Sequence, residues 1–538
     1  MQQDARPAAA LPDLSRDHGD SLIVFEDDDI LVVNKAPDWN THAAAAHAGE
    51  GIYDWLRSRQ ARWADLAIIH RLDKQTSGLL VFGKSRRANQ SLTEQFATRG
   101  VGKIYRLRTV RRHAEQTFSV DAPLRVQGGA PRPAATRFEY IGRSGDCFDY
   151  HAFPLTGRTH QVRIHAAAAG IAVLGDEEYG DKHGQADRLY LHAETLQFRH
   201  PADDRALTFT IPAEFERAGA ARRAAVIAPA LTNSWRLLHG AADGAPGIYA
   251  DLHGDRILIQ SAVGKQETAA ALRQVEAQRP EVKAIYVREL RTQPGEADKG
   301  ESSPLVRRGA VDSPTTVVRE NGVSYELRFD EGYSVGIFND QRDNRRRVLS
   351  GYIAPDFELF APGGAQPVLL NTFAYTCAFS VCAALAGAQT VSLDLSRKYL
   401  DWGRANFALN DLTTEGHEFL YGDVFDWLRM FGRRGRMFDA VILDPPTFSR
   451  SKRGVFRVAR DMGQLVEQAL AVLKPGGVLL ASSNAAKWRA ADFVQAVHDG
   501  VATARRAIRR EHYQPQPPDF PITRSEPAYL KTLWLQVD

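Results

Sequence analysis

The sequence is poor in cysteine and has no long apolar segment. Only Cys147, Cys377 and Cys382 occur among its 538 residues, which is too few for a disulfide framework and favours a reducing, cytoplasmic location. No run approaches the ~18 apolar residues that a membrane-spanning helix needs, and the polar N-terminus lacks the apolar core of a secretory signal. His192 and His200 have no cysteine or acid at a metal-ligand spacing. We therefore expect no membrane segment and no metal.

An excess of charge of one sign is also missing. The net charge is only +3, with 44% hydrophobic and 25% charged residues, which excludes a largely disordered chain, a collagen and a coiled-coil rod. The length predicts about two to four domains. Basic residues, chiefly arginines, are nevertheless concentrated in the runs 84–108, 342–347 and 450–460. Each run alone is typical of a solvated surface, but beside catalytic motifs they indicate a polyanionic substrate.

Changes in patterning divide the chain into segments. Residues 1–20 are expected to be a disordered tail. Apolar strands and Gly/Pro turns over 21–215 predict a mixed-sheet domain, and the Ala/Arg-rich segment 216–230 predicts a linker. Strand-like runs around one helical stretch predict a small α+β domain over 231–340. From 341 to 538, apolar strands alternate with helical stretches, which predicts a Rossmann-like, doubly wound sheet. The expected fold is multidomain, α+β and α/β.

The segment IIHRLDKQTSG (68–78) contains an aspartate between two cations, with Arg71 and Lys74 flanking Asp73. Neighbouring positive charge favours an ionised carboxylate, which could act as nucleophile or base without a metal. From the charges alone, a salt-bridged turn before a strand is the simpler interpretation. A protein-kinase catalytic loop is a poor match, because His-Arg-Leu-Asp contains an extra residue and no glycine-rich loop precedes it.

A second polar segment, TGRTHQVRIH, lies at 156–165. It carries Arg158, His160, Gln161, Arg163 and His165, and we expect it to form a strand. Alternation along a strand would place Arg163 on the same face as Gln161 and His165. The presence of this second segment weighs against a purely structural interpretation of the first.

Together with GKIYRL (102–107) and LHAETLQFRHP (191–201), these motifs resemble the RluA family of pseudouridine synthases, in family order over about residues 20–215. The resemblance implies that Asp73 is the essential aspartate, that Tyr105 lies against the target uracil and that Arg163 pairs with Asp73. Arg71 would enter the RNA helix where the uridine leaves the stack. The residues expected to bind RNA in this domain are Arg71, Lys74, Lys103, Arg158 and His160.

The C-terminal half contains a second set of motifs. VLLNTFAYTCAFSV (368–381) reads as a strand, a small-residue loop and a helix, and Asp394 ends the next strand. Such a loop at the carboxyl end of a first parallel strand is where doubly wound folds bind nucleosides. The segment lacks the G-x-G-x-x-G fingerprint, and alone it fits an ordinary α/β unit equally well. Asp423 and the Asp-Pro-Pro at Asp444 follow in order and strengthen the prediction of a cofactor site.

This half resembles class I S-adenosylmethionine methyltransferases, more narrowly the RlmI and RlmK types of large-subunit rRNA methyltransferase. The resemblance runs from about residue 231 to the end and rests on LLHGAADGAPGIYADLHGD, GIFNDQRDNR, NTFAYTCAFSV, LDLS, DPPTFSRSK and EPAYLKTLWL. It implies S-adenosylmethionine as the cofactor and residues 231–340 as a substrate-facing domain.

The resemblance also assigns roles to individual residues. Asp394 would bind the ribose, Asp423 the adenine edge, and Asp444 would lie at the methyl-transfer site. The remaining residues expected to shape or close the cofactor pocket are Asn371, Phe373, Tyr375, Gln341 and Arg345.

Cysteine bears on which atom is methylated. Making 5-methylcytosine needs a thiolate that attacks the ring, and in RlmI-type enzymes that cysteine follows the strand after the Asp-Pro-Pro strand. Here this position reads ASSNAAKW (481–488) without cysteine, and Cys377 and Cys382 are expected to be packing residues. Transfer to a nitrogen is therefore favoured. DPPTFS with its basic continuation is most similar to the RlmK type, which makes 7-methylguanine, and Lys452 and Arg453 are expected to bind RNA.

The leading interpretation is a bifunctional RNA-modifying enzyme that isomerises a uridine and methylates a base. Its expected partner is rRNA, with tRNA as the alternative. A cytosine-C5 methyltransferase joined to a pseudouridine synthase stays open, as does a protein in which one half only binds RNA. Methylation of a protein or small molecule would leave the synthase motifs unexplained.

Overall fold

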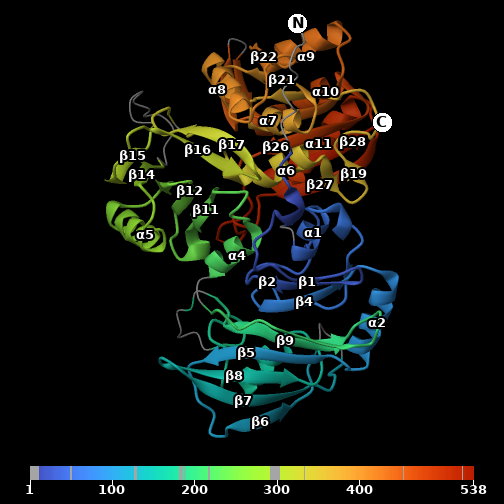
Figure 1. Ribbon diagram of the computed structural model, residues 1–538, viewed down its shortest axis with the longest axis vertical. Helices are drawn as coiled ribbons and strands as arrows, with labels where there is room; N and C mark the ends of the chain where they lie inside the picture. The colour runs from blue at the N-terminus through green and yellow to red at the C-terminus, as the bar shows by residue number, and fades with distance from the viewer. Residues whose placement is uncertain are drawn as a thin grey trace, which may run out of the picture.

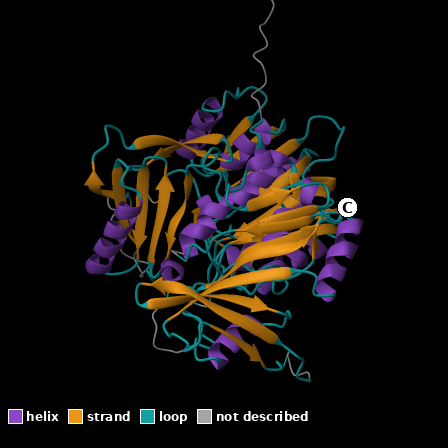
Figure 2. Cartoon of the chain, turned by 60° about the horizontal axis from the view of Figure 1, so that its bottom comes forward, coloured by secondary structure: helices purple, strands orange, loops and turns teal. Residues whose placement is uncertain are grey.

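The chain folds into an N-terminal domain, a middle domain and a C-terminal domain, which Figure 1 shows at the bottom, left and top. The computed structural model describes residues 11–48, 51–125, 130–180, 186, 188–215, 218–290, 303–332, 334–451, 454–523 and 525–538. Sheets form the centre of each domain, with most helices packed on their faces (Figure 2). The predicted mixed α+β and α/β architecture is confirmed.

The N-terminal domain is built on one large mixed sheet with the strand order β1-β2-β4-β9-β5-β8-β7-β6, in which β3 also pairs with β4 and β10 with β9. The strands are β1 (Ile23–Glu26), β2 (Ile30–Lys35), β3 (Ala67–Ile68), β4 (Ser77–Gly83), β5 (Gly102–Thr109), β6 (Thr117–Asp121), β7 (Ala135–Ser144), β8 (Cys147–Pro154), β9 (Leu191–Arg199) and β10 (Ala206–Thr210). The central β4 is buried along its whole length, so the loop before it is fixed at one end by the core.

Short helices cover this sheet: α1 (Ile52–Arg57), α2 (Arg86–Ala97), α3 (Gln161–Ala168) and the 3-10 turn η2 (Ala61–Trp63). The prediction of a strand around residues 158–165 is wrong, because residues 158–160 form a turn and α3 begins at Gln161. The run QVRIH fits both periods; on a helix, Gln161 and His165 are one turn apart, and both bond the Thr136 hydroxyl, at 3.1 and 2.9 Å. Arg163 therefore lies on a different side from these two residues.

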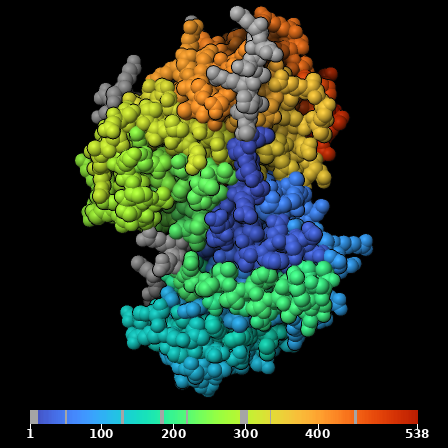
Figure 3. Space-filling model, in the orientation of Figure 1, coloured from blue at the N-terminus to red at the C-terminus, as the bar shows by residue number. Residues whose placement is uncertain are grey.

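The prediction of a disordered tail over 1–20 is wrong for its second half, while residues 1–10 lie outside the described part. Residues 14–16 form the 3-10 turn η1 (Leu14–Arg16). Asp17 is only 2% exposed and pairs with Arg59 and Arg346. Burial of a charged side chain requires such partners, and one of them, Arg346, lies 329 residues away in sequence. In Figure 3 this segment, in dark blue, runs up toward the C-terminal domain.

Most of the segment predicted as a linker, 216–230, is a packed helix. Helix α4 (Ala218–Val226) follows the last strand of the first sheet, and Ala225, Val226 and Ile227 belong to the same hydrophobic cluster as Trp55 of α1. Arg222 and Arg223 are buried as well. The composition suggested a linker because alanine and arginine carry no strand pattern, but both are good helix formers.

The middle domain is a sheet of order β11-β12-β13-β14-β15, followed by a separate hairpin. Its elements are β11 (Ser234–His239), η3 (Gly240–Asp243), β12 (Ile248–His253), β13 (Arg256–Ser261), α5 (Lys265–Gln278), β14 (Ala284–Glu289), β15 (Leu305–Gly309), β16 (Thr315–Glu320) and β17 (Val323–Arg328). One cluster of buried side chains joins Leu258 and Tyr286 of this sheet to Leu369 and Trp534 of the C-terminal domain. The two domains therefore share a core.

The C-terminal sheet has the order β22-β21-β20-β23-β26-β28-β27. Its strands are β20 (Val368–Thr372), β21 (Gln389–Asp394), β22 (Glu418–Tyr421), β23 (Phe438–Leu443), β26 (Leu473–Ser483), β27 (Ile508–Pro515) and β28 (Lys531–Val537). The pairs from β22 to β26 are parallel and the last two are antiparallel. The chain order reverses at β20 and β23, and ligands of doubly wound folds bind beyond the strand ends at such a point.

The remaining C-terminal elements surround this sheet. The helices are α6 (Arg342–Ser350), preceded by the 3-10 turn η4 (Asn339–Gln341), α7 (Ala378–Leu385), α8 (Arg397–Ala408), α9 (Val424–Arg433), α10 (Val458–Leu470) and α11 (Ala490–Thr503). The short strands are β18 (Tyr352–Ala354), β19 (Phe357–Glu358), β24 (Phe448–Ser451) and β25 (Gly454–Arg457), paired as two hairpins.

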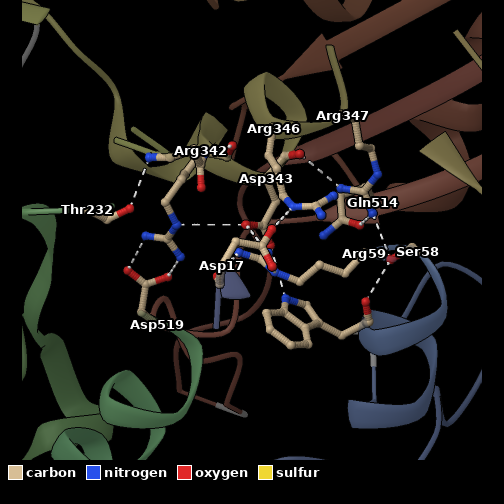
Figure 4. Close-up of polar contacts among 12 residues, drawn as sticks. Asp17, Ser58, Arg59, Thr232, Arg342, Asp343, Arg346, Arg347, Gln514 and Asp519 are labelled. Atoms are coloured by element: carbon tan, nitrogen blue, oxygen red, sulfur yellow. Dashed lines mark hydrogen bonds and ion pairs between the residues drawn. The ribbon is translucent and has the colours of Figure 1, made fainter. Parts of the chain in front are cut away.

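The arginine run 342–347 is not a surface for a polyanion, as its composition had suggested. These residues form most of α6, and Arg342, Arg345, Arg346 and Arg347 are all buried. Their charges are compensated by acids or polar groups from distant segments, several of which Figure 4 draws. Sequence alone could not show this, because the compensating groups become neighbours only in the folded chain.

Candidate functional sites

A large open cavity lies over the N-terminal sheet and contains the first set of predicted residues. We call it the N-terminal cavity; its volume is about 1020 Å³. It lies among the loop before α1, the loop before β4, the end of α2, strand β5 and the start of α3. Asp73, Tyr105 and Arg163, more than thirty residues apart in sequence, all line it.

Two side chains hydrogen-bond the backbone on either side of Asp73. The Thr41 hydroxyl donates to the Leu72 carbonyl at 2.9 Å, and the Lys35 ammonium donates to the Lys74 carbonyl at 3.1 Å. Lys35 is fully buried, and burial lowers the pKa of its ammonium to about 7. The Asp73 carboxylate itself is 24% exposed, so it is held rigidly at its base and open toward the cavity.

Arg163 connects Asp73 to two further acids. Its Nη1 lies 3.6 Å from the Asp73 carboxylate, while Nε and Nη2 make a bidentate pair with Asp176 at 2.7 and 2.8 Å. Nη2 also reaches Glu178 at 3.3 Å. Burial opposes the charge on Arg163, and the Asp176 pairing outweighs it, so the pKa of the guanidinium is raised. The cation stays in place, and one of its nitrogens faces Asp73.

His160 and Tyr105 complete the surroundings of Asp73. His160 adopts a left-handed conformation, with φ 55°, at the N-terminus of α3; such strain is found mainly at functional sites. Its Nε2 lies 3.7 Å from the Asp73 carboxylate, and its Nδ1 lies 3.0 Å from the Tyr179 hydroxyl. Burial, helped by the Asp73 charge, raises the pKa of Tyr105, so its phenol keeps its proton at neutral pH.

Most of the residues predicted to bind RNA in this domain line the same cavity: Arg71, Lys103, Arg158 and His160. Arg71 is exposed, and its guanidinium is 3.4 Å from His42. Lys103 lies over the Phe96 ring at 4.9 Å. Lys74 is placed differently, since its ammonium donates to the Ile522 carbonyl of the C-terminal domain at 3.3 Å.

In the C-terminal domain, the loop after β20 has an unusual backbone. Phe373, Tyr375 and Cys377 all have positive φ, at 54°, 46° and 60°, which costs energy for residues with a side chain and is often retained for function. The Tyr375 amide donates to Asp394 at 2.9 Å, and the Tyr375 hydroxyl donates to the Ser334 carbonyl. Asn371 is buried and donates to the Ser380 hydroxyl. This bond links the strand before the loop to the helix after it.

Next to this loop is a smaller pocket of about 240 Å³, which we call the C-terminal pocket. Its lining includes the rings of Phe373, Phe425 and Phe456 and the carboxylate of Asp423, which also caps α9 by accepting from the Phe425 amide. Asp394 precedes Leu395, another lining residue, and burial raises the pKa of its carboxyl. Aromatic rings can stack on a purine, and carboxylates at the pocket edge can accept hydrogen bonds from the hydroxyl and amino groups of a nucleoside. These residues would hold S-adenosylmethionine.

Asp444 lies at the carboxyl end of β23 and forms a small cluster with Gln341 and Ser482, which we call the Asp444 cluster. The Gln341 amide donates to Asp444 at 3.1 Å and to the Ser482 hydroxyl at 2.9 Å. Burial raises the pKa of the Asp444 carboxyl to about 6. The neighbouring loops are also linked, because Thr447 and Asn484 bond at 2.8 Å. The carboxyl group after β23 is therefore surrounded by neutral groups, Ser482 from the end of β26 and Gln341 from η4.

Arg345 does not reach this cluster with a hydrogen bond. Its guanidinium makes a bidentate pair with Glu320 at 2.6 and 2.7 Å and donates to the Phe338 carbonyl. Phe338 in turn lies 5.6 Å from the Tyr375 ring. Arg345 is thus connected to the Tyr375 loop through Phe338, and it does not line the C-terminal pocket. Lys452 and Arg453, predicted to bind RNA, lie outside the described residues.

Sequence reasoning missed several residues at these sites. Asp176 and Glu178, which pair with Arg163, belong to the segment GDEEYG (175–180). Its three consecutive acids were the one sequence feature that could have indicated a partner for an arginine. Phe456, on the hairpin β24–β25, carried no signal, because an isolated phenylalanine fits any core. Among the described residues no group of acids, histidines and cysteines is arranged to hold a metal, and no helix in the described part of the chain could span a membrane.

Comparison with known proteins identifies a different enzyme family for each half of the chain. Residues 29–168 match the RNA pseudouridylate synthase family, and residues 308–535 match the family of S-adenosylmethionine-dependent methyltransferases. The C-terminal part is 32% identical over 328 residues to a ribosomal RNA large subunit methyltransferase of Deinococcus radiodurans, covering 60% of this chain and 78% of that one.

Two further relatives carry more specific names. Ribosomal RNA large subunit methyltransferase I of Escherichia coli is 31% identical over 308 residues, covering 56% of this chain and 73% of that one. Methyltransferase K/L of a Psychrobacter species is 42% identical over 177 residues, covering 32% of this chain and only 20% of that protein.

Fold and sites together define an enzyme with a pseudouridine synthase domain and an S-adenosylmethionine-dependent methyltransferase domain in one chain. The chain belongs to the family of ribosomal RNA large subunit methyltransferases, here fused to an RluA-type pseudouridine synthase.

Proposed function

We propose that this protein modifies RNA twice, isomerising a uridine in the N-terminal cavity and methylating a guanine nitrogen of 23S rRNA beside Asp444. The single observation that carries the second assignment is the Asp444 cluster, where Ser482 stands and no cysteine is present. The substrate assignment draws on relatives named as ribosomal RNA large subunit methyltransferases. We place the reaction in the cytoplasm, where ribosomes are made.

The first reaction breaks the N1–C1′ bond of uridine and forms a C5–C1′ bond. A proton leaves C5 and N1 gains one, so no redox partner is needed. Asp73 supplies the carboxylate that attacks or deprotonates, and Tyr105 supplies a ring face and a phenol beside it. An open cavity about 1020 Å³ in volume has room for an extruded nucleotide and part of its backbone, and Arg71 and Arg158 at its wall supply cations for phosphate.

In the second reaction, S-adenosylmethionine supplies the methyl group when bound. Phe373, Phe425 and Phe456 would enclose the adenine, with Asp423 at its edge and Asp394 on the ribose. Asp444 and Gln341 would hold the target base, so that a ring nitrogen lone pair faces the donor. A nitrogen needs no covalent activation, whereas carbon-5 of cytosine does. Burial raises the pKa of the buried thiols Cys377 and Cys382 to about 12, which makes them poor nucleophiles.

The test is nucleoside mass spectrometry of rRNA from a strain lacking the gene, complemented with wild type, Asp73→Asn or Asp444→Ala. Carbodiimide labelling distinguishes pseudouridine from uridine, which has the same mass. We expect a 7-methylguanine and a pseudouridine to disappear together, and each variant to restore only the modification of the other domain. Loss of 5-methylcytosine instead would refute the nitrogen assignment. Unchanged rRNA would refute the rRNA assignment, and tRNA from the same strains would then be analysed.

A further inference from the structure

Helix α6 is rich in charged residues and yet is almost completely buried. Residues 342–349 are all buried although the stretch contains Arg342, Asp343, Arg345, Arg346 and Arg347. A buried charge is tolerated only with partners. These partners come from every part of the chain, so α6 has no complete environment inside the C-terminal domain alone.

The synthase domain, with the segment that precedes it, supplies one side of this environment. The Trp55 indole and the Arg59 guanidinium donate to the two oxygens of Asp343, at 3.3 and 3.2 Å. Asp17 accepts from Arg346 and pairs with Arg59 at 3.1 Å. Figure 4 shows Asp17, Asp343, Arg59 and Arg346 converging in one network between the two domains.

The C-terminal domain supplies the other side. Asp519 forms a bidentate pair with Arg342, at 2.9 and 2.6 Å. Gln514 accepts from Arg347 at 2.6 Å, and the same Arg347 nitrogen donates to Ser58 of the synthase domain at 3.0 Å. Helix α6 therefore has the synthase domain on one side and the rest of the C-terminal domain on the other.

The N-terminal end of the same helix reaches the Asp444 cluster. Gln341 is the N-cap of α6, and its amide contacts both Asp444 and Ser482. Asn344, one turn into the helix, donates to Oε1 of the Gln341 side chain at 2.7 Å and so fixes which way the amide points. Asp343, which the synthase domain holds, lies between these two residues. A shift of α6 would thus move Gln341 relative to Asp444.

We propose that the synthase half forms part of the methyltransferase active-site scaffold: Asp17, Trp55 and Arg59 are positioning residues that hold α6 and thereby place Gln341 against Asp444. The fusion is then required for methylation geometry and does more than tether two enzymes. This inference rests on the proposed methyl transfer at Asp444, and its test includes a measurement that needs no RNA substrate.

The test compares full-length variants. Arg59→Gln removes the cation between Asp17 and Asp343, and Arg59→Lys restores it. Trp55→Phe removes only the indole donor and leaves a ring for packing against Trp39. Tyr352→Phe is the matched control, because its hydroxyl crosses the same interface to the Arg57 carbonyl from β18 instead of from α6.

The measurements are methyl incorporation and pseudouridylation in rRNA from the deletion strain, melting temperature, and hydrogen–deuterium exchange of residues 338–350. For Arg59→Gln and Trp55→Phe we expect kcat for methylation to fall at least tenfold and threefold, with KM for S-adenosylmethionine within twofold. Exchange of α6 amides should rise, and pseudouridylation should stay within twofold. Arg59→Lys should recover at least half of the methylation, and Tyr352→Phe should match wild type.

Two results would overturn the proposal. One is unchanged α6 exchange in both variants. The other is an equal fall of both activities in Trp55→Phe, which would mean that the network only stabilises the fold. If wild-type protein methylates no rRNA, the proposed function fails, while the exchange experiment still decides whether the synthase half holds α6.

Discussion

The N-terminal cavity and the Asp444 cluster each centre on one aspartate, but the two aspartates have opposite surroundings. Asp73 faces an open cavity and has Arg163 and His160 within 3.7 Å. Asp444 is contacted by the neutral groups of Gln341 and Ser482, and burial raises its pKa to about 6. Cations stabilise a carboxylate that must carry charge into a reaction, while neutral donors suit one that orients a base. The environment, more than the residue type, separates the two chemistries.

The two domains also differ in the size of their pockets. The N-terminal cavity is about 1020 Å³ and the C-terminal pocket about 240 Å³. A nucleotide that leaves an RNA helix carries its backbone with it and needs room, whereas the adenosine part of a cofactor fits a narrow aromatic slot.

The largest effect is expected for Asp73→Asn. The amide keeps the shape but cannot attack or accept a proton, so pseudouridylation should fall by about 10³-fold or more. Methylation by the same preparation should stay within twofold. Time courses on one RNA, with both products measured, check this. A parallel loss of methylation would show that the two sites are coupled.

The second effect concerns Asp444→Asn, which should lower methylation by about 100-fold. The pKa of Asp444 is raised to about 6, so the group is protonated below pH 6 and a carboxylate above it. If the carboxylate orients the base, the wild-type methylation rate should rise with pH through about 6 and then level off. A pH–rate profile that keeps this step in Asp444→Asn would contradict the assignment.

A smaller effect is expected for Arg163→Lys. Lysine keeps the charge but cannot bind Asp176 through two nitrogens and face Asp73 with a third. We expect pseudouridylation to fall about 10- to 100-fold through kcat, with RNA affinity little changed. Single-turnover kinetics separate the two quantities. The control is Arg137→Lys, whose pair with Glu139 is partly exposed; an equal loss in both variants would refute the role of the bidentate geometry.

The smallest effect is expected for Phe456→Leu in the C-terminal pocket. Leucine keeps the apolar volume but removes the ring that lies 6.0 Å from Phe373. Base stacking on an aromatic side chain contributes about 1–3 kcal/mol, so KM for S-adenosylmethionine should rise about tenfold and kcat should change little. Titration calorimetry with S-adenosylhomocysteine provides the check. An unchanged affinity would place the adenine elsewhere.

The order of the motifs made much of the fold predictable. The alternation of apolar strands and helices after residue 341 indicated the parallel sheet, because buried parallel strands require continuous apolar runs. The motif residues Asp73, Tyr105 and Arg163 were likewise identified before any geometry, and the structure brings them to one cavity. Segment 158–165 was misassigned because five residues of mixed polarity satisfy both the strand and the helix period.

The sequence by itself determined which chemistries this chain can host, through its ordered motifs and through the absence of cysteine after the Asp-Pro-Pro strand. Only the tertiary structure decided that the arginines of 342–347 are internal, that Asp17 belongs to a network and that Asp176 holds Arg163. The physical reason is the cost of burying charge. A charged run looks solvated until its partners are known, and those partners lie up to 329 residues away in the chain.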